Sequence, residues 1–298
     1  MRVAVVGAAG LIGRRLAADL LARGDEVVAL SRAGAAGIAG ARDVRWDPAT
    51  GPVPAGALDG CDAVVNLAGA PIGGHRWTAA RKRLITGSRT GTTRLLVDAL
   101  AADGAPRVLV NASAVGYYGP RGDEEVDERT PPGDDFLARA CVAWEREALR
   151  AREHGARVML VRTGIVLARE GGALPLLALP VRFLAAGAVG GGRQWIPWIH
   201  VDDESGLFRL ALDRPDLEGP LVGAAPNPVR QRDFAAELGR VLRRPAVIPA
   251  PALPIRLALG EAATLALDGQ RAVPRAALAA GYRFRHPDLG AALRALYA

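Results

Sequence analysis

Residues 3–13 read VAVVGAAGLIG, and this stretch decides the fold of the chain. A short apolar run stops at Gly7, and further glycines follow at Gly10 and Gly13, a spacing that predicts a strand, a tight turn and the start of a helix. Gly7 suits the backbone angles of the turn, Gly10 lets a diphosphate approach the main chain, and Gly13 lets the helix lie against the strand. Because the first N–H groups of that helix are unpaired, they attract phosphate.

The residues that follow the glycines support this interpretation. Apolar residues recur at helical spacing, from Leu11 and Ile12 onward, and Gly24 is placed to end the helix. Residues 26–30 then read as a second strand. A glycine triplet alone is a weak indication, because a glycine-rich chain contains some by chance, but here the motif has the flanking elements that it requires. We therefore predict a dinucleotide site that includes Leu11 and Ile12.

The end of the second strand distinguishes between the two nicotinamide dinucleotides. A site selective for NAD usually has Asp or Glu there, to accept hydrogen bonds from the ribose. This chain has Ser31 and Arg32 instead, and a guanidinium and a hydroxyl both suit a 2′-phosphate. The alternative is that Arg32 is one of many solvated arginines. We predict NADP as the cofactor.

Composition indicates a globular protein of one large domain, or of a core with a smaller lobe: 298 residues, 50% hydrophobic and 23% charged. Two isolated cysteines, Cys61 and Cys141, favour a reducing compartment, and we expect a cytoplasmic protein. The first apolar run is too short for a signal peptide. Prolines, an arginine and a glycine interrupt the apolar residues 174–189, so no membrane span is expected.

The net charge of +7 raises the possibility of nucleic-acid binding. However, the arginines are scattered along the chain and Lys82 is its only lysine, which indicates a compositional bias rather than a binding patch. We therefore expect no nucleic-acid partner. The sequence contains no Walker loop, no zincin motif and no clustered Cys/His site, and no bound metal is expected.

Predicted strands and helices alternate along the first half of the chain, which favours an α/β fold with a doubly wound parallel (Rossmann) sheet. We place this domain at residues 1–225 and a smaller C-terminal substrate lobe at 226–298, to which residues 166–197 contribute. Asp134 or Asp135 is expected to cap the helix that runs to about His154. After the first two strands, the next are expected at residues 44–47, 63–67, 107–112 and 157–162, with a helix at 78–102.

Ligands of such sheets bind beyond the carboxyl ends of the strands. This rule brings the glycine loop, residues 66–69, residues 113–118 and residues 163–164 around one crevice. Ser113 could donate to a substrate oxygen, and Tyr117 or Tyr118 could supply a phenolic proton if a nearby cation stabilised the phenolate. The alternative is that Ser113 is a turn residue and that the tyrosines only pack.

Several stretches together resemble the extended short-chain dehydrogenases/reductases, and within them an epimerase-like family of the NAD-dependent epimerase/dehydratase type with a DUF1731-like C-terminal lobe. The resemblance covers nearly the whole chain. It implies an NADP(H)-binding sheet domain with a substrate lobe, and it makes Ser113 the match to the superfamily's catalytic serine. The stretches are VAVVGAAGLIG, LSR at 30–32, DAVVNLAGAPI at 62–72, SR at 88–89, NASAVGYYG at 111–119, VRTGIVL at 161–167, GGGRQWIPWIHVDD at 190–203 and GQRAVP at 269–274. The residues it implies near the cofactor are Ser31, Arg32, Leu67, Ala68, Gly69, Arg89 and Ile165.

The sequence departs from the superfamily at the catalytic pair. The wider superfamily has a tyrosine, with a lysine four residues later that lowers its pKa. If Glu145 is the glutamate that usually follows this lysine, the two positions hold Leu137 and Cys141, and neither can do the chemistry. An arginine could supply the positive charge and Tyr117 or Tyr118 the proton. Cys141 as a nucleophile is the weaker alternative, since a lone helical cysteine usually packs in the core.

Residues 195–203 contain further candidates. His200 could be a general base, although within an apolar strand a hydrogen-bonded structural role is favoured. Trp195 and Trp198 could form an aromatic wall against substrate or pack in the core. Asp202 and the aspartate after it read first as a helix start.

We therefore predict an NADP(H)-dependent, epimerase/oxidoreductase-like enzyme of unusual active site that acts on an unknown small molecule, as a monomer or homodimer. The alternative is a redox sensor or scaffold that binds NADP(H) without turnover. The missing tyrosine–lysine pair favours the alternative, whereas the serine loop and the substrate lobe favour an enzyme.

Overall fold

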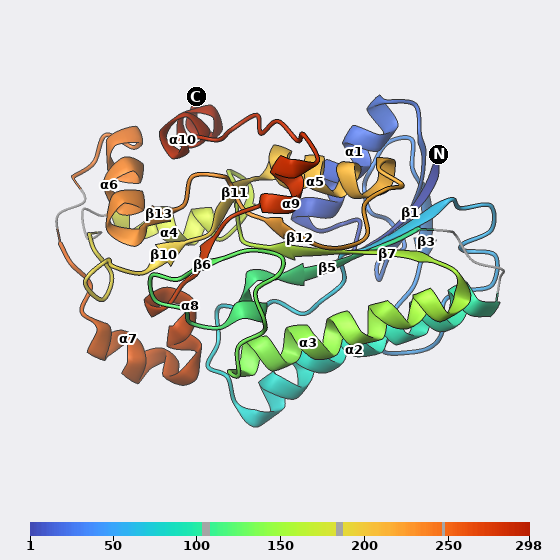
Figure 1. The fold of residues 1–298 in the computed structure, drawn as a ribbon, viewed down its shortest axis with the longest axis horizontal. Helices are drawn as coiled ribbons and strands as arrows, with labels where there is room; N and C mark the ends of the chain where they lie inside the picture. Colours follow the sequence, from blue (N-terminus) through green and yellow to red (C-terminus); the bar gives the residue numbers. More distant parts are fainter. Residues whose placement is uncertain (103–107, 183–186, 246–247) are drawn as a thin grey trace.

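A parallel seven-stranded sheet forms the centre of the computed structural model, which describes residues 1–102, 108–182, 187–245 and 248–298. The strand order is β12-β7-β5-β4-β1-β2-β3, so the predicted Rossmann fold is confirmed. The carboxyl ends of the strands point toward the end of the molecule that holds α6, α7 and α10 (Figure 1). The strands are β1 (Arg2–Val6), β2 (Glu26–Ser31), β3 (Arg42–Arg45), β4 (Ala63–Asn66), β5 (Val108–Ala114), β7 (Arg157–Thr163) and β12 (Gly219–Gly223).

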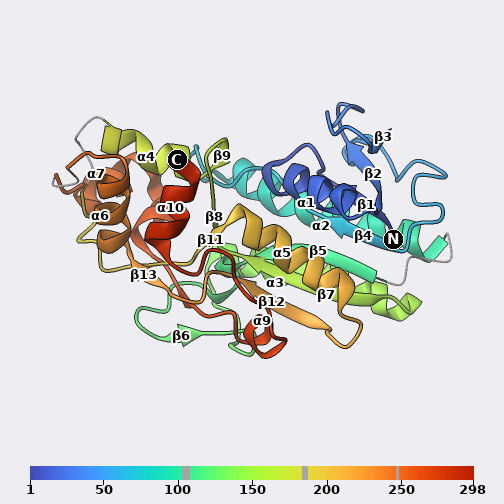
Figure 2. The same ribbon diagram turned by 90° about the horizontal axis from the view of Figure 1, so that it is seen from above.

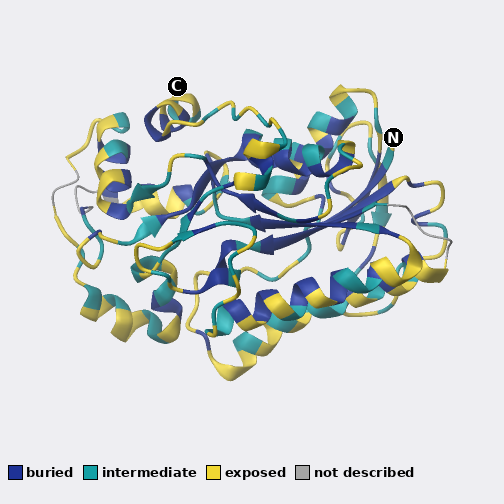
Figure 3. Ribbon diagram, in the orientation of Figure 1, coloured by how far each residue is buried: buried dark blue, intermediate teal, exposed yellow. Residues whose placement is uncertain are grey.

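Helices cover both faces of this sheet (Figure 1). On one face lie α1 (Leu11–Ala22) and α5 (Val201–Asp213); on the other lie α2 (Ala79–Ala102) and α3 (Phe136–Leu149). Successive residues of a strand point to opposite faces, so Val3 and Val5 pack with the first helix pair and Ala4 and Val6 with the second. The strands are therefore buried on both sides, as Figure 3 shows, and this is why their sequences are continuously apolar.

Several predicted strands differ from the observed ones at their ends, and the largest differences are at β3 and β5. β3 spans Arg42–Arg45 rather than residues 44–47, because it pairs in register with β2 and the chain turns at Asp47. β5 continues to Ala114 because its pairing with β7 extends to that residue, and a 3-10 turn, η1 (Val115–Tyr118), follows. The first residue predicted for this strand, Arg107, lies outside the described residues. Asp135 is the cap of α3, since its side chain accepts from the backbone of Ala138.

A second apolar cluster joins residues from the two segments that were assigned to the substrate lobe. Leu174 on α4 (Leu174–Arg182) shares it with Phe234 and Leu293, and Trp198 on β11 (Trp198–His200), just beyond the first segment, belongs to it as well. Figure 2 shows α4 beside α6 (Gln231–Val241) and α10 (Leu289–Tyr297). The remaining elements are β6 (Glu125–Val126), η2 (Arg150–His154), β8 (Ile165–Ala168), β9 (Gly171–Gly172), β10 (Trp195–Ile196), β13 (Val229–Arg230), α7 (Ala252–Leu259), η3 (Gly260–Ala263), α8 (Thr264–Leu267), β14 (Arg271–Ala272) and α9 (Arg275–Ala279).

No helix among the described residues combines the length and the apolar character needed to cross a membrane.

Candidate cofactor and active site

The loop between β1 and α1 has the geometry of a phosphate-binding turn. Gly7 has a φ of +81°, in the left-handed region that favours glycine. A Cβ on Gly13 would lie 2.5 Å from the carbonyl oxygen of Gly7, so only glycine lets the helix approach the loop this closely. Gly10 precedes α1 without a side-chain cap. The first N–H groups of α1 are therefore open to an anion.

The carboxyl end of β4 lies against this loop. A Cβ on Gly7 would lie 3.2 Å from the carbonyl carbon of Leu67 and 3.3 Å from the nitrogen of Ala68. Asn66, fully buried at the end of the strand, accepts from the Ala68 nitrogen and donates to Asn111 on β5. This asparagine bridge was not predicted from the sequence, although two asparagines at the ends of apolar strands are a signal for it. It fixes the backbone on which a ligand would rest.

At the end of β2, Ser31 and two arginines form a polar group. The hydroxyl of Ser31 is buried and has no hydrogen-bond partner among the described residues. Arg32 is exposed, and Arg45, the register partner of Ser31 on β3, lays its side chain over Gly34. We did not predict Arg45, because the third strand was placed two residues too late. An orphaned hydroxyl beside two arginines suits a phosphate.

Arg89 on α2 is a partly buried cation beside Gly69. Its guanidinium donates to the backbone oxygens of Ala70 and Ile85, both at 3.0 Å, and lies 5.1 Å from the ring centre of Trp144. A Cβ on Gly69 would lie 3.0 Å from the Arg89 Cζ atom. Burial lowers the pKa of Arg89, and in the part of the chain that the structure describes no carboxylate forms an ion pair with it. This arrangement suits an anionic ligand.

Ser113 belongs to a buried polar network beneath the carboxyl end of β5. Its hydroxyl donates to Oε1 of Glu145 at 2.6 Å. Both oxygens of Glu145 accept from Arg162 on β7, at 2.9 and 3.0 Å, and both side chains are buried. Burial opposes the charge of Arg162, but the hydrogen bonds and the charge of Glu145 raise its pKa overall. The network therefore holds the Ser113 hydroxyl in one orientation.

The two tyrosines of the serine loop contact the same guanidinium differently. The hydroxyl of Tyr118 accepts from Arg162 at 3.1 Å; this side chain is fully buried, and burial raises its pKa. Tyr117 is half-buried, and the Arg162 Cζ atom lies 3.5 Å from the centre of its ring. Only Tyr117 is thus partly open to a ligand while it remains against the cation.

The positions of the superfamily's tyrosine and lysine are occupied by packing residues. Leu137 contacts Gly116, and Cys141 is buried, which raises the pKa of its thiol to about 12. Lys82 forms an ion pair with Glu261, and its ammonium lies 5.1 Å from the centre of the Phe136 ring. The cation beside the tyrosines is therefore Arg162. The arginine that could replace the lysine was left unidentified in the sequence, although an arginine within the apolar strand VMLVRT requires a partner.

The residue after Arg162 points to the opposite face of the sheet, as alternation along a strand requires. Thr163 Oγ1 lies 2.6 Å from Oε1 of Glu204 on α5. Glu204 is fully buried, and burial raises its pKa to about 8. The backbone nitrogen of Ile165, two residues on, donates to Pro197 at 2.7 Å. The sequence placed Thr163 at the crevice without a role, and Glu204 was not predicted.

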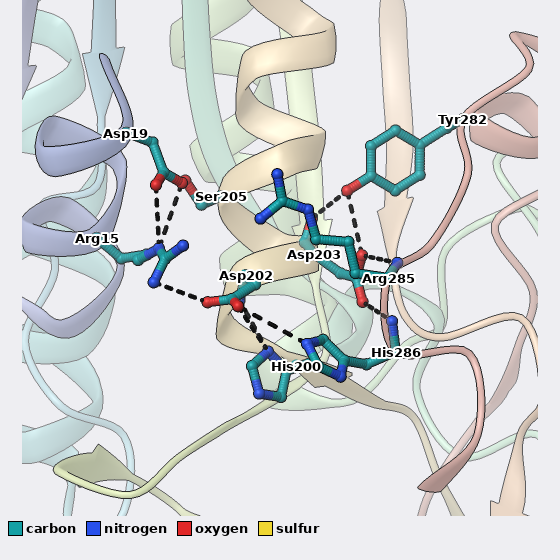
Figure 4. Close-up of polar contacts among 9 residues, drawn as sticks. All are labelled: Arg15, Asp19, His200, Asp202, Asp203, Ser205, Tyr282, Arg285 and His286. Carbon is teal, nitrogen blue, oxygen red and sulfur yellow. Dashed lines mark hydrogen bonds and ion pairs between the residues drawn. The ribbon is translucent and has the colours of Figure 1, made fainter. Parts of the chain in front are cut away.

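His200 has a structural role in this arrangement. It caps α5, because its Nδ1 accepts from the nitrogen of Asp202 at 3.1 Å, and its ring stacks on His286 at 3.7 Å between ring centres (Figure 4). The helix begins at Val201, one residue before the predicted start. The ligand atoms of His200, Asp202 and His286 lie within 4.8 Å of one another. Because the two rings are only 28° from parallel and Nδ1 is already an acceptor, this geometry favours hydrogen bonding over coordination of one ion.

The two tryptophans lie in different environments. Trp198 is 1% exposed and belongs to the second apolar cluster. Trp195 donates to Asp123 at 3.0 Å and carries Arg230 over its ring at 3.9 Å. Asp123 and Arg230 also line a cavity of about 300 Å³ next to Pro120. Core packing thus accounts for Trp198, whereas Trp195 lies beside an open pocket.

Comparison with known proteins defines the protein family to which the chain belongs. Residues 3–221 match the NAD dependent epimerase/dehydratase family, and residues 250–296 match a domain of unknown function, DUF1731. The chain belongs to the NAD-dependent epimerase/dehydratase family, which confirms the resemblance seen in the motifs.

Within that family, the chain is similar to epimerase family proteins called SDR39U1. It is 39% identical to the human protein, with 100% of both chains covered, and 40% identical to a chloroplastic homologue from Arabidopsis thaliana, covering 99% of this chain and 86% of that one. The crystal structure of human SDR39U1 (isoform 2) with NADPH is 38% identical, with a TM-score of 0.89 and 99% of each chain covered. UDP-glucuronic acid 4-epimerase from Bacillus cereus, 16% identical with a TM-score of 0.81, shares the fold.

Proposed function

We propose that this protein binds NADP(H) at the carboxyl edge of its sheet and is an epimerase/oxidoreductase-like enzyme acting on a small molecule. The observation that carries the proposal is the polar group at the end of β2. The buried Ser31 hydroxyl has no partner among the described residues, and Arg32 and Arg45 adjoin it. The NADPH in the human SDR39U1 structure supports the same choice of cofactor.

The order of the strands indicates the direction of the cofactor. The glycine loop with Leu11 and Ile12 would hold the diphosphate, and the 2′-phosphate would lie at the end of β2, on one side of β1. The other half of the dinucleotide would then extend past Leu67, Ala68 and Gly69 toward β5 and β7, on the opposite side of β1. Arg89 and Ile165 lie along that direction, at the edges of the same crevice.

At the ends of β5 and β7, three residues are arranged for proton chemistry. A bound nicotinamide would supply hydride transfer to or from a substrate carbon. The Ser113 hydroxyl donates its hydrogen bond to Glu145 and not, as the sequence had suggested, to a substrate oxygen, so it would accept a hydrogen bond from a substrate hydroxyl. Tyr117 holds the exchangeable proton at its phenolic oxygen, and Arg162 supplies positive charge through the face of the ring. Tyr118 orients Arg162 from the interior.

We also propose a division into two domains and a cellular compartment. A Rossmann domain at residues 1–225 and a substrate lobe at 226–298 are supported by the apolar cluster shared between α4 and the helices after residue 226. Two free, buried cysteines, Cys61 and Cys141, favour the cytoplasm.

A second candidate function is that of a sensor or scaffold that binds NADP(H) without turnover. The observation that favours it is the replacement of the tyrosine–lysine pair by Leu137 and Cys141, both packed in the protein. The buried network that orients Ser113 and the guanidinium over the ring of Tyr117 favour the enzyme.

Calorimetric titration with NADPH, NADP⁺ and NADH tests the proposal. We expect NADPH to bind more tightly than NADH, and Arg32→Ala to weaken NADPH about tenfold or more while NADH changes little. Arg83→Ala, at an exposed arginine of α2, is the matched control and should bind like the wild type. Absence of binding by all three dinucleotides would overturn the proposal.

A further inference from the structure

Glu204 is a buried carboxyl group at the edge of the candidate site, and it has no charged partner in the part of the chain that the structure describes. It lies in the first turn of α5, and its side chain is fully buried. Oε1 contacts Thr163 Oγ1 at 2.6 Å, whereas Oε2 has no hydrogen-bond partner among the described residues. A Cβ on Gly223 would lie 2.7 Å from Oε2, so β12 closes over the carboxyl group. The proposed proton chemistry of Ser113 and Tyr117 does not use this group.

The charged side chains on the surrounding elements are directed elsewhere. Figure 4 shows Asp202 paired with Arg15 of α1, and Asp203 holding the C-terminal segment at Arg285 and His286. On the same elements, Asp19 of α1 accepts from Ser205, Arg23 at the end of α1 pairs with Asp213 of α5, and Arg162 of β7 pairs with Glu145. Arg157 of β7 donates to the backbone oxygens of Ala211, Leu212 and Leu217, and Glu128 accepts from the nitrogen of Val222 on β12. Burial and the Thr163 hydrogen bond are thus the influences that act on Glu204, and burial is the larger.

Thr163 connects this carboxyl group to the crevice. It is the last residue of β7 and the register partner of Ala114 on β5, next to Ser113. In the proposed direction of the cofactor, the nicotinamide half reaches the ends of these two strands. The partly exposed Thr163 would then lie between the ring and the buried carboxyl group.

We infer that Glu204, acting through Thr163, senses the charge of the nicotinamide, so that NADP⁺ binds with release of a proton from this carboxyl group and NADPH does not. The inference rests on the proposed function. The oxidised ring carries a positive charge that stabilises a carboxylate, and in a dry interior this attraction is weakly screened. When Glu204 is protonated, its carboxyl group donates to Thr163 Oγ1, and the threonine hydroxyl is free to donate to a ligand. When Glu204 is ionised, the carboxylate accepts a hydrogen bond from the threonine hydroxyl instead.

The ratio of the affinities for NADP⁺ and NADPH, measured by calorimetry from pH 6.5 to pH 9, tests the inference. The 2′-phosphate is common to both forms, so its titration cancels in the ratio. As the pH rises across this range, we expect the ratio to shift in favour of NADP⁺ by roughly tenfold, because the binding of NADP⁺ is linked to the release of one proton. Titrations in two buffers of different ionisation enthalpy should show proton release with NADP⁺ only.

Variants show whether Glu204 or another titratable group causes the pH dependence of the affinity ratio. Glu204→Gln should hold the ratio constant with pH within about twofold and abolish the proton release. Glu218→Gln, at a half-exposed glutamate paired with Arg152, is the matched control and should titrate like the wild type. Thr163→Val, a second variant of similar shape, should reduce the pH dependence if Glu204→Gln does not fold.

The outcomes distinguish the inference from the proposed function. If both dinucleotides bind and the wild-type ratio does not change with pH, the inference is wrong and the cofactor site stands. If the ratio titrates equally in Glu204→Gln, another group is responsible and the inference is again wrong. If neither dinucleotide binds, the proposed function and the inference fail together.

Discussion

Two buried glutamates on opposite faces of the sheet are held in opposite ways. Glu145 on α3 is paired through both oxygens with Arg162, whereas the hydroxyl of Thr163 is the only partner of Glu204 on α5 among the described residues. Their partners, Arg162 and Thr163, are consecutive residues of β7. One of them neutralises a carboxylate, and the next binds a carboxyl group that pairs with no cation in the described part of the chain. Alternation along the strand sends the two partners to different faces.

The difference shows how a protein can bury the same side chain for two purposes. A buried carboxylate with a bidentate arginine stays ionised and acts as a fixed acceptor, here for Ser113. A buried carboxyl group without a cation has its pKa raised by desolvation, and Glu204 is therefore poised near neutral pH. The first arrangement fixes geometry, and the second can respond to charge.

The largest effect is expected when the paired glutamate loses its partner. Arg162→Met leaves the Glu145 carboxylate buried and uncompensated, and should lower the free energy of unfolding by about 3–5 kcal/mol in urea titration at pH 7. Adding Glu145→Gln should recover much of this loss. Arg152→Met removes an exposed pair and should cost less than about 1 kcal/mol. If Arg162→Met costs no more than this control, the pair is not what holds Glu145.

The unpaired glutamate should show the opposite response, which depends on pH. Its pKa in the folded protein is about 8, against an ordinary 4.5, so between these values the folded state binds a proton that the unfolded state lacks. This contribution to stability is present at low pH and is lost as the pH rises toward 8. Glu204→Gln removes the loss and should be more stable than the wild type by about 2–4 kcal/mol at pH 8, with little difference at pH 5.

Urea midpoints at the two pH values measure this difference. Glu218→Gln, at the half-exposed glutamate, should show no such dependence on pH and is the control. A gain in Glu204→Gln of equal size at pH 5 and pH 8 would contradict the assignment, because it would indicate packing rather than ionisation.

The comparison also shows how far sequence reasoning can reach. The glycine loop and the end of β2 could be predicted because their chemistry is local: Gly7, Gly10 and Gly13 form the motif itself, and Arg32 directly follows the next strand of the chain. The doubly wound parallel sheet was predicted from the alternation of strands and helices, and the observed sheet confirms it.

The partners of β7 could not be predicted in the same way. Glu145 was recognised only as a marker of the missing lysine, and Glu204 was given no role, although the two aspartates before it were read as a helix start. Which face of α3 or α5 meets the sheet is set by packing between distant elements, and this decides that Arg162 meets one glutamate and Thr163 the other. An arginine followed by a polar residue at the end of an apolar strand is the signal that a closer reading could have used.

The smallest losses of stability should come from removing the hydroxyls of Thr163 and Ser113. These two variants test the comparison between Glu204 and Glu145 most directly. Thr163→Val removes the hydrogen-bond partner of Glu204 and should cost about 1–3 kcal/mol at pH 7. Ser113→Ala leaves Glu145 with both bonds from Arg162 and should cost about 1 kcal/mol or less. Thr50→Val, at an exposed loop residue, is the control for the threonine change and should stay within about 0.5 kcal/mol of the wild type.

The order of these two losses matters more than their size. Thr163 is the only partner of Glu204 among the described residues, so no other group replaces its hydrogen bond when it is removed. Glu145 accepts three hydrogen bonds, and the two from Arg162 remain when Ser113 is changed. Urea titrations of both variants in parallel measure the order directly. If Ser113→Ala costs more than Thr163→Val, then Arg162 does not satisfy Glu145 by itself, and the contrast between a saturated and an unsaturated glutamate does not hold.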